Sequence, residues 1–118
     1  MEPNYVYGDA ERKIVKAGYE AIESVLAGND TNAKRRLLFY LDWYMDPYYK
    51  HDLTDLYEPL KELLQQMVIS ENEDDIIEDA LYLLESYTDP PYDKLREYID
   101  KAPQQFLPKV RYLVNQKE

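Results

Sequence analysis

The residue with the widest chemical range in this sequence is its single histidine, His51. An imidazole can act as a general base or bind a metal ion, but either role needs suitable side chains nearby. The sequence has no cysteine, which removes the thiol nucleophile and the thiolate metal ligand together. His51 stands between Lys50 and Asp52, in a segment that we predict to be a loop. We therefore interpret it as an exposed loop residue and predict that the chain is not an enzyme.

A run of carboxylates in residues 71–79 is the second candidate for chemistry. Carboxylate oxygens bind Ca²⁺, but an EF-hand loop also needs a glycine at its sixth position, and this region has none. Acid–base catalysis needs a buried carboxyl group with a raised pKa, which nothing in the sequence indicates. We predict no catalytic, cofactor-binding or metal-binding residues. The run is interpreted as the solvated start of a helix, where the helix dipole favours negative charge.

Lys34, Arg35 and Arg36 form the basic cluster of the first half of the chain. They fall in the first turn of a predicted helix, where positive charge is mildly unfavourable. Two interpretations stay open. The cluster pairs with an acidic helix of the same molecule, or it binds an anion or an acidic partner.

Tyrosine is unusually frequent, with 13 residues against two phenylalanines and one tryptophan. Tyrosine combines a large contact area with a hydroxyl group, which is typical of recognition surfaces. Tyr44 and Tyr87 fall on apolar stripes, so we expect them in the core. Four aromatic residues lie off or beyond the stripe around one predicted helix end and are predicted to bind a partner: Tyr40, Trp43, Tyr48 and Tyr49. A corresponding set of tyrosines occurs later in the chain, at Tyr82, Tyr87, Tyr92 and Tyr98.

Composition and charge restrict the possible partners. A length of 118 residues fits a single domain, and the 45% apolar and 32% charged fractions exclude a disordered or membrane-embedded chain. The net charge of −10 argues against nucleic acid, which needs a basic face. Residues 71–100 hold eleven acids and two bases, whereas residues 101–118 hold four bases and one acid. One part of the molecule is thus strongly acidic.

The location is predicted from the absence of targeting signals. Residues 1–9 have neither an apolar core nor a basic start, so no signal peptide is expected. No apolar run approaches the roughly 18 residues of a membrane span. A chain without cysteine suits a reducing compartment. We therefore predict a cytoplasmic protein with no membrane partner.

Apolar periodicity predicts six helices. The first is expected at 9–27, with Asp9 as its N-cap, Glu11 at the positive end of its dipole, Gly18 on its apolar stripe and Gly28 as the left-handed residue that ends it. The core candidates of the second helix are Leu37, Leu38, Leu41 and Met45, helped by Phe39, Tyr40 and Tyr44. This second helix is expected at about 30–45. The other four are expected at about 56–68, 71–87, 92–101 and 106–116. Short connections favour antiparallel neighbours.

Two segments of the chain match each other without gaps. Residues 33–49 align on residues 76–92 at an offset of 43. The identical pairs are Leu38/Leu81, Leu41/Leu84, Tyr44/Tyr87, Asp46/Asp89, Pro47/Pro90 and Tyr49/Tyr92. In each copy the helix ends in Asp-Pro and a leucine-rich helix follows.

This pattern resembles the helical-hairpin repeats of the HEAT and armadillo class. The resemblance implies an all-α fold of five to six helices in antiparallel hairpins, stacked in the right-handed HEAT-like manner. The chain would then be one domain, 1–118, with an internal repeat at 33–70 and 76–115. The alternative is an irregular orthogonal helical bundle, in which the match between the two segments arises by chance.

The chain is also similar in type to the bacterial immunity proteins, which are small, acidic, cysteine-free helical inhibitors of toxins. This likeness implies a protein partner, a basic toxin domain, bound without catalysis. The acids expected at the interface, beside the four aromatic residues, are Asp74, Asp75, Glu78, Asp79, Glu85 and Asp89. The alternative is a small HEAT-like adaptor or scaffold subunit of a larger assembly. The sequence leaves the oligomeric state open.

Overall fold

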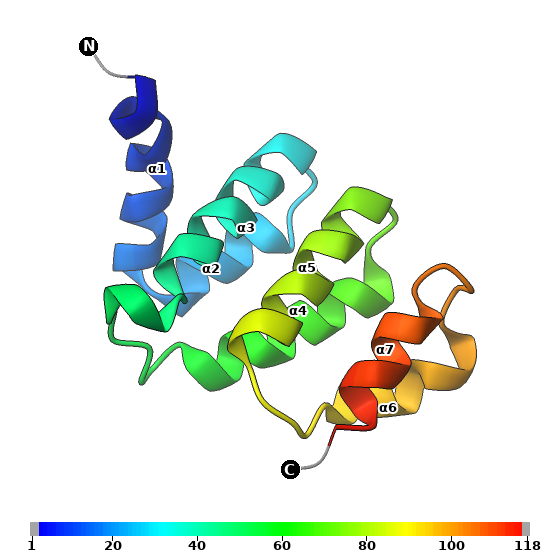
Figure 1. Ribbon diagram of the computed structural model, residues 1–118. Coiled ribbons are helices and arrows are strands. Elements are labelled where there is room, and N and C mark those ends of the chain that lie inside the picture. Colours follow the sequence, from blue (N-terminus) through cyan, green and yellow to red (C-terminus); the bar gives the residue numbers. More distant parts are fainter. Residues whose placement is uncertain (1–2, 117–118) are drawn as a thin grey trace. The chain divides into compact units, whose positions relative to one another are not determined.

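The computed structural model describes residues 3–116, and every secondary-structure element within this range is a helix (Figure 1). The elements are α1 (Pro3–Ala17), α2 (Tyr19–Leu26), α3 (Thr31–Tyr44), η1 (Pro47–Tyr49), α4 (Tyr57–Ser70), α5 (Asp74–Tyr87), α6 (Asp93–Tyr98), η2 (Ile99–Lys101) and α7 (Leu107–Val114). The predicted all-α class is confirmed, with seven α-helices in this range instead of five or six. None of these helices is both long enough and apolar enough to cross a bilayer.

The chain divides into two compact units, residues 1–59 and residues 60–118. Each unit has its own helix packing. The single domain and the HEAT-like stack along the whole chain stay predictions.

In the first unit, helices α1, α2 and α3 pack against one another pairwise. Asp30 begins α3, because its carboxylate accepts a hydrogen bond from the backbone N–H of Ala33 at 3.0 Å. This predicted cap is confirmed. Apolar side chains from all three helices fill the core, including Val15, Ile22, Leu26, Leu37 and Leu41.

The prediction of one helix over 9–27 is wrong, because Gly18 separates α1 from α2. Gly18 has φ 114° and ψ −179°, a backbone conformation that residues other than glycine rarely adopt. Gly28 is not left-handed as predicted, and Ala27 ends α2 in the right-handed helical region. Gly28 instead allows a close approach, since a Cβ atom there would lie 3.3 Å from the carbonyl oxygens of Ser24 and Val25.

Gly18→Ala should lower the free energy of unfolding by about 1–3 kcal/mol, through backbone strain alone. A Cβ atom at Gly18 would meet nothing within 4 Å, so no steric contact contributes. Gly8→Ala is the matched control, because Gly8 lies inside α1 and its Cβ position is also open. This control should raise stability by about 0.5–1 kcal/mol through helix propensity. Urea unfolding of both variants measures the difference, and a shift in the same direction for both would refute the role of Gly18.

The predicted start of the first helix is also wrong. Because α1 begins at Pro3, Asp9 lies inside the helix and is not its N-cap. The carboxylate of Asp9 pairs with Arg12 and Lys13 in the next turn. Hydrogen bonds from Arg12 and then from Lys13 lower the pKa of Asp9 below its usual value. Glu11 is buried and does not lie at the solvated end of the helix.

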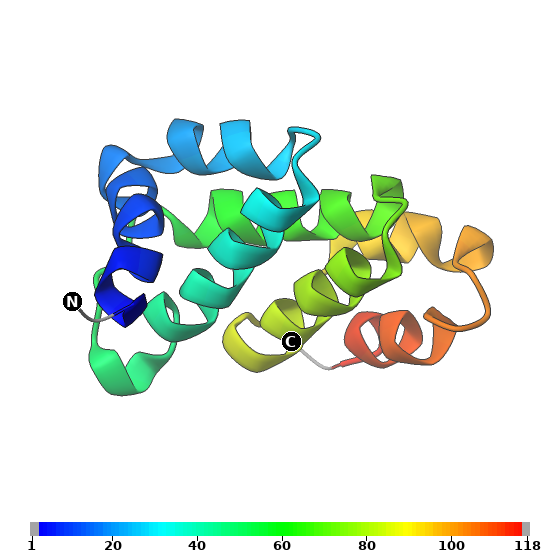
Figure 2. The same cartoon turned by 90° about the horizontal axis from the view of Figure 1, so that it is seen from above.

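In the second unit, α4 and α5 fold back on each other across the connection 71–73, and α7 packs against both α5 and α6 (Figures 1 and 2). Pro59 lies in the first turn of α4, as its missing N–H requires. The core contains side chains from every helix of the unit, including Leu60, Leu64, Ile76, Leu84, Leu95 and Leu113.

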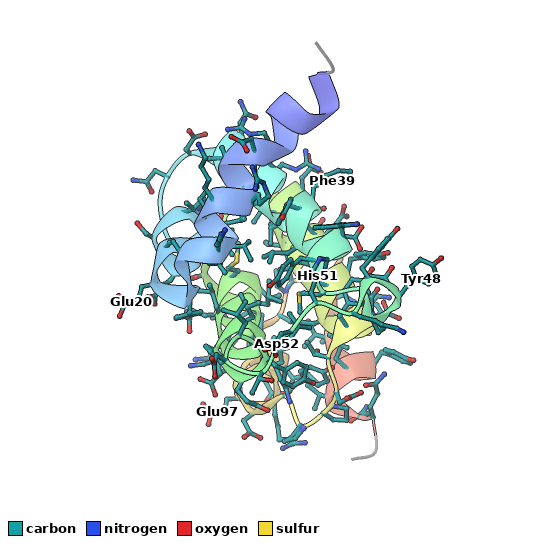
Figure 3. All side chains as sticks on the ribbon, turned by 90° about the vertical axis from the view of Figure 1, so that its left-hand side faces the viewer. Glu20, Phe39, Tyr48, His51, Asp52 and Glu97 are labelled. Atoms are coloured by element: carbon teal, nitrogen blue, oxygen red, sulfur yellow. The ribbon has the colours of Figure 1, made fainter. Side chains whose placement is uncertain are left out.

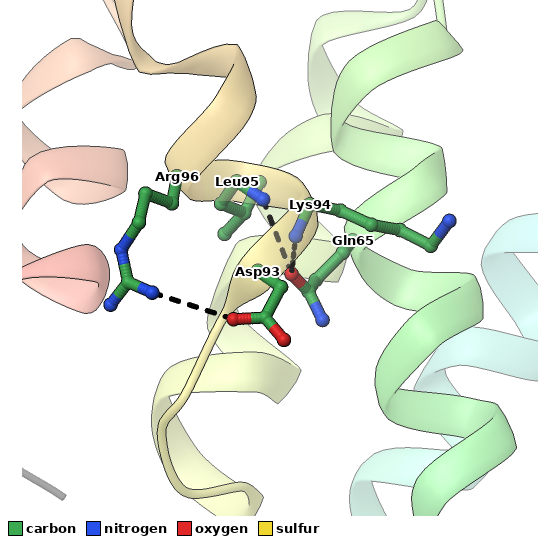
Figure 4. A network of polar contacts seen from close by, with 5 residues as sticks. All are labelled: Gln65, Asp93, Lys94, Leu95 and Arg96. Carbon is green, nitrogen blue, oxygen red and sulfur yellow. Dashed lines mark hydrogen bonds and ion pairs between the residues drawn. The ribbon is translucent and has the colours of Figure 1, made fainter.

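Gln65 fixes the start of α6 from within α4 (Figure 4). Its Oε1 atom accepts hydrogen bonds from the backbone N–H groups of Lys94 and Leu95, at 3.1 and 3.2 Å. Its Nε2 atom donates to the carbonyl oxygen of Lys61 at 3.3 Å. The first N–H groups of a helix have no partner within the helix, so a side chain from another helix supplies the acceptor here.

Tyr92 lies in the core of the second unit, with 0% of its surface exposed. Its hydroxyl group donates to the carbonyl oxygen of Leu84 at 3.2 Å and lies 2.9 Å from Oγ1 of Thr88. The Nζ atom of Lys61 lies 5.1 Å from the centre of the Tyr92 ring. A buried tyrosine needs a partner for its hydroxyl, and the end of α5 provides two.

The two segments that match in sequence also match in helix length, since α3 and α5 both have 14 residues and both bounds are offset by 43. The aligned leucines are buried in both helices, at Leu38, Leu81, Leu41 and Leu84. The match ends after the Asp-Pro turn, because Tyr49 is 47% exposed whereas its equivalent Tyr92 is fully buried.

Two predictions about aromatic core residues are wrong. Phe39 is exposed, because it lies about 160° around the helix from the buried Leu37 and Leu41. Tyr44 and Tyr87, the last residues of α3 and α5, are half-buried at the edge of each core.

Candidate partner-binding surfaces

Six aromatic and imidazole side chains gather where α3 ends. We call them the Trp43 cluster: Tyr40, Trp43, Tyr44, Tyr48, Tyr49 and His51. The last turns of α3 carry the first three, and η1 carries the next two. Asp46 begins η1 by accepting a hydrogen bond from the Tyr48 N–H at 2.9 Å. Lys50 then adopts a left-handed conformation with φ 58°, which turns the chain back toward α3.

His51 is the centre of this cluster. It lies in a loop, as predicted, but it is half-buried and not exposed. Its ring stacks on Tyr44, with centroids 4.3 Å apart and planes at 12°. It meets Trp43 at 4.4 Å in an edge-to-face arrangement. Its Nδ1 atom lies 3.0 Å from the carbonyl oxygen of Tyr44, which accepts the hydrogen bond. Carbonyl groups at a helix end lack partners within the helix, so the imidazole satisfies one of them and braces the aromatic rings.

The outer rings of the Trp43 cluster face away from the core. In Figure 3, Tyr48 points outward from the end of α3, and it is 80% exposed, whereas His51 is half-buried. Trp43 and Tyr49 are also exposed, with ring centroids 5.5 Å apart, and Tyr48 meets Tyr49 edge to face at 5.1 Å. Tyr40 is half-buried, and its burial raises its pKa above the usual value. The structure thus brings together all four aromatic residues predicted to bind a partner.

The six acids that we predicted to be partner-binding do not form one patch. Four lie in the first two turns of α5, at Asp74, Asp75, Glu78 and Asp79. Asp89 follows the other end of the helix, and 14 residues of helix extend over about 20 Å. Glu85 is held by the chain itself, since the Nζ atom of Lys109 in α7 lies 2.5 Å from its Oε1 atom.

A face formed by α5 and α7 contains residues that the sequence analysis did not select. Tyr82 is 51% exposed and Tyr112 is 53% exposed. Asp75, Glu78, Tyr82 and Glu85 follow one another at helical spacing along the outer side of α5. Lys109 contacts Glu85 and also lies 5.9 Å from the centre of the Tyr112 ring. The position of Tyr82 between two carboxylates, one turn before and one turn after it, is a sequence signal that could have identified this face.

The basic cluster takes part in an internal ion pair. Nε of Arg36 lies 3.3 Å from Oε2 of Glu11 in α1, and the Glu11 side chain is only 5% exposed. Lys34 is itself buried in the first unit. The first of the two interpretations, pairing with a helix of the same molecule, is therefore correct for Arg36.

Residues 3–116 contain no group of three or more His, Cys, Asp or Glu side chains that could hold a metal ion. Comparison of the chain with models of protein families, with curated proteins and with solved structures finds no match.

Proposed function

We propose that this chain is a non-enzymatic protein-binding module, and that it acts as an immunity protein against a basic bacterial toxin domain. The observation that carries the proposal is the Trp43 cluster. Tryptophan and tyrosine are the side chains that most often dominate protein interfaces. The ring contacts of His51 and Tyr49 hold Trp43 in place before binding, so little side-chain entropy is lost when a partner docks.

The charge of the chain supports a basic partner. The net charge is −10, and exposed carboxylates lie in the first turns of α5 at Asp74 and Glu78. A negative surface attracts a positive partner over several ångströms and speeds docking, in a way that salt weakens. A toxin that acts on nucleic acid would present the required positive surface, because phosphate binding needs lysine and arginine.

A growth test examines this proposal. The product of each gene adjacent to this one is expressed in a bacterial host, with and without this chain. We expect one product to be lethal alone and harmless together with the chain. Trp43→Ala should weaken binding to that toxin domain about tenfold to 30-fold, since a hot-spot side chain is lost. Tyr112→Ala, which removes an exposed ring outside the cluster, should bind like the wild type. Equal affinities for all three proteins would refute the role of the Trp43 cluster.

A HEAT-like adaptor or scaffold subunit is the second candidate, favoured by the matching lengths and buried leucines of α3 and α5. Such an adaptor would use the aromatic residues and not the acids. Charge reversal at Asp74 and Glu78 separates the two functions, because both side chains are exposed and their loss should not unfold α5. The reversal should abolish protection from a basic toxin and should leave an adaptor active.

A further inference from the structure

The α5–α7 face already binds one cation belonging to the chain. Nζ of Lys109 lies 2.5 Å from a carboxylate oxygen of Glu85 and 5.9 Å from the centre of the Tyr112 ring. A carboxylate neutralises the ammonium group, and the negative face of an aromatic ring adds a cation–π attraction. On this face, a glutamate and a tyrosine therefore hold a cation together.

The same pair of side-chain types occurs again on α5, at Glu78 and Tyr82. They are four residues apart, so they lie on the same side of the helix and within reach of one ligand. Both are exposed, whereas the opposite side of α5 is buried through Ile77, Leu81 and Leu84. Within residues 3–116, Glu78 makes no ion pair with a lysine or arginine of the chain. A cation from outside the chain can therefore occupy this pair.

We propose that Glu78 and Tyr82 bind an arginine side chain in a basic segment of the protein partner. This inference rests on the proposed function, because it names the side chain that a basic toxin domain would present to α5. Arginine fits better than lysine for two reasons. Its planar guanidinium group stacks on an aromatic ring, and it donates two parallel N–H groups to one carboxylate.

The test uses two synthetic peptides in place of the toxin. Each is an alanine-based helical peptide of about 16 residues, with basic residues three or four positions apart, and the two differ only in carrying arginine or lysine. Binding to the isotope-labelled full chain is followed by amide chemical shifts at low salt. We expect shifts centred on Glu78 and Tyr82, and an affinity for the arginine peptide about threefold above that for the lysine peptide.

Two variants and two controls complete the experiment. Tyr82→Ala and Glu78→Gln should each weaken binding of the arginine peptide about twofold to fivefold, as expected for an exposed cation–π contact or ion pair. Tyr112→Ala should bind the peptide like the wild type, because Lys109 already occupies that ring. Glu97→Gln, an exposed acid on α6, should also leave the affinity unchanged. All four substitutions change exposed residues, and unchanged amide shifts elsewhere show that the fold is retained.

The inference is overturned by any of three results: no binding of the arginine peptide, equal affinity for both peptides, or full affinity in Tyr82→Ala and Glu78→Gln. The titration contains no toxin, so its outcome is independent of the growth test. A failed titration beside successful protection would remove the arginine site and leave the proposed function. A successful titration without any protective effect would leave the arginine site and remove the proposed function.

Discussion

Replacing Gln65 with alanine should lower the free energy of unfolding by about 2–4 kcal/mol, because it removes one acceptor that serves two backbone N–H groups. Those groups belong to Lys94 and Leu95 at the start of α6. The Leu95 hydrogen bond is buried, and water cannot replace the lost acceptor there without opening the contact between α4 and α6. The substitution also leaves a small cavity, since Gln65 is itself buried.

Gln66→Ala is the matched control for this variant. Gln66 is the next residue of α4 but is exposed, so its replacement should change stability by no more than about 0.5 kcal/mol. Chemical denaturation gives both free energies, and hydrogen exchange locates the effect. The amides of Lys94 and Leu95 should lose protection in Gln65→Ala and keep it in Gln66→Ala. Equal stability of the two variants would show that Gln65 does not hold α6 in place.

Replacing Arg36 with alanine should destabilise the first unit by about 2–3 kcal/mol. The reason is the carboxylate of Glu11, which is 5% exposed and would lose the guanidinium group 3.3 Å away. Losing one partner of a fully buried pair costs about 3–5 kcal/mol, and the expected value is lower because Arg36 is 44% exposed. Thermal or urea unfolding measures the loss.

A second substitution shows whether the buried charge is the cause. Glu11→Gln in the Arg36→Ala background should recover at least about 1 kcal/mol, because it removes the carboxylate that has lost its partner. Arg12→Ala is the control, since its pair with Asp9 is exposed and its loss should destabilise the chain far less than Arg36→Ala does. If Glu11→Gln destabilises the Arg36→Ala variant further, the ion pair is not the source of the effect.

The elements that the sequence predicts well are those encoded within a few neighbouring residues. The Asp30 cap, the apolar stripe of α3 and the Asp-Pro stop after it are all local signals. The break at Gly18 was missed because a glycine on an apolar stripe is compatible with a continuous helix as well as with a positive φ. Only the packing of α1 on α2 decides between them.

Interactions between distant residues could not be predicted. Gln65 meets Leu95 across 30 positions, and Arg36 meets Glu11 across 25 positions. Their side chains look like ordinary helix residues in the sequence, since nothing local marks a polar side chain that will be buried. The different burial of Tyr49 and Tyr92, two aligned tyrosines, has the same cause.

The candidate site was predicted in part. Helical spacing placed Tyr40 and Trp43 on one side of α3, and the chain direction after Asp-Pro placed Tyr48 and Tyr49 nearby. The role of His51 depends on the left-handed turn at Lys50, which sequence reasoning did not find. The acids were grouped by closeness in sequence, whereas the length of α5 separates Asp89 from the others and Lys109 engages Glu85.

The most direct test of the central claim is a footprint of the bound partner. Hydrogen exchange of this chain is compared with and without the toxin domain selected by the growth test. We predict slower exchange at the backbone amides of residues 48–51, which carry the outer rings of the Trp43 cluster, and in the first turns of α5. Protection confined to other segments, with residues 48–51 exchanging as in the free chain, would contradict the proposal that these rings form the docking surface.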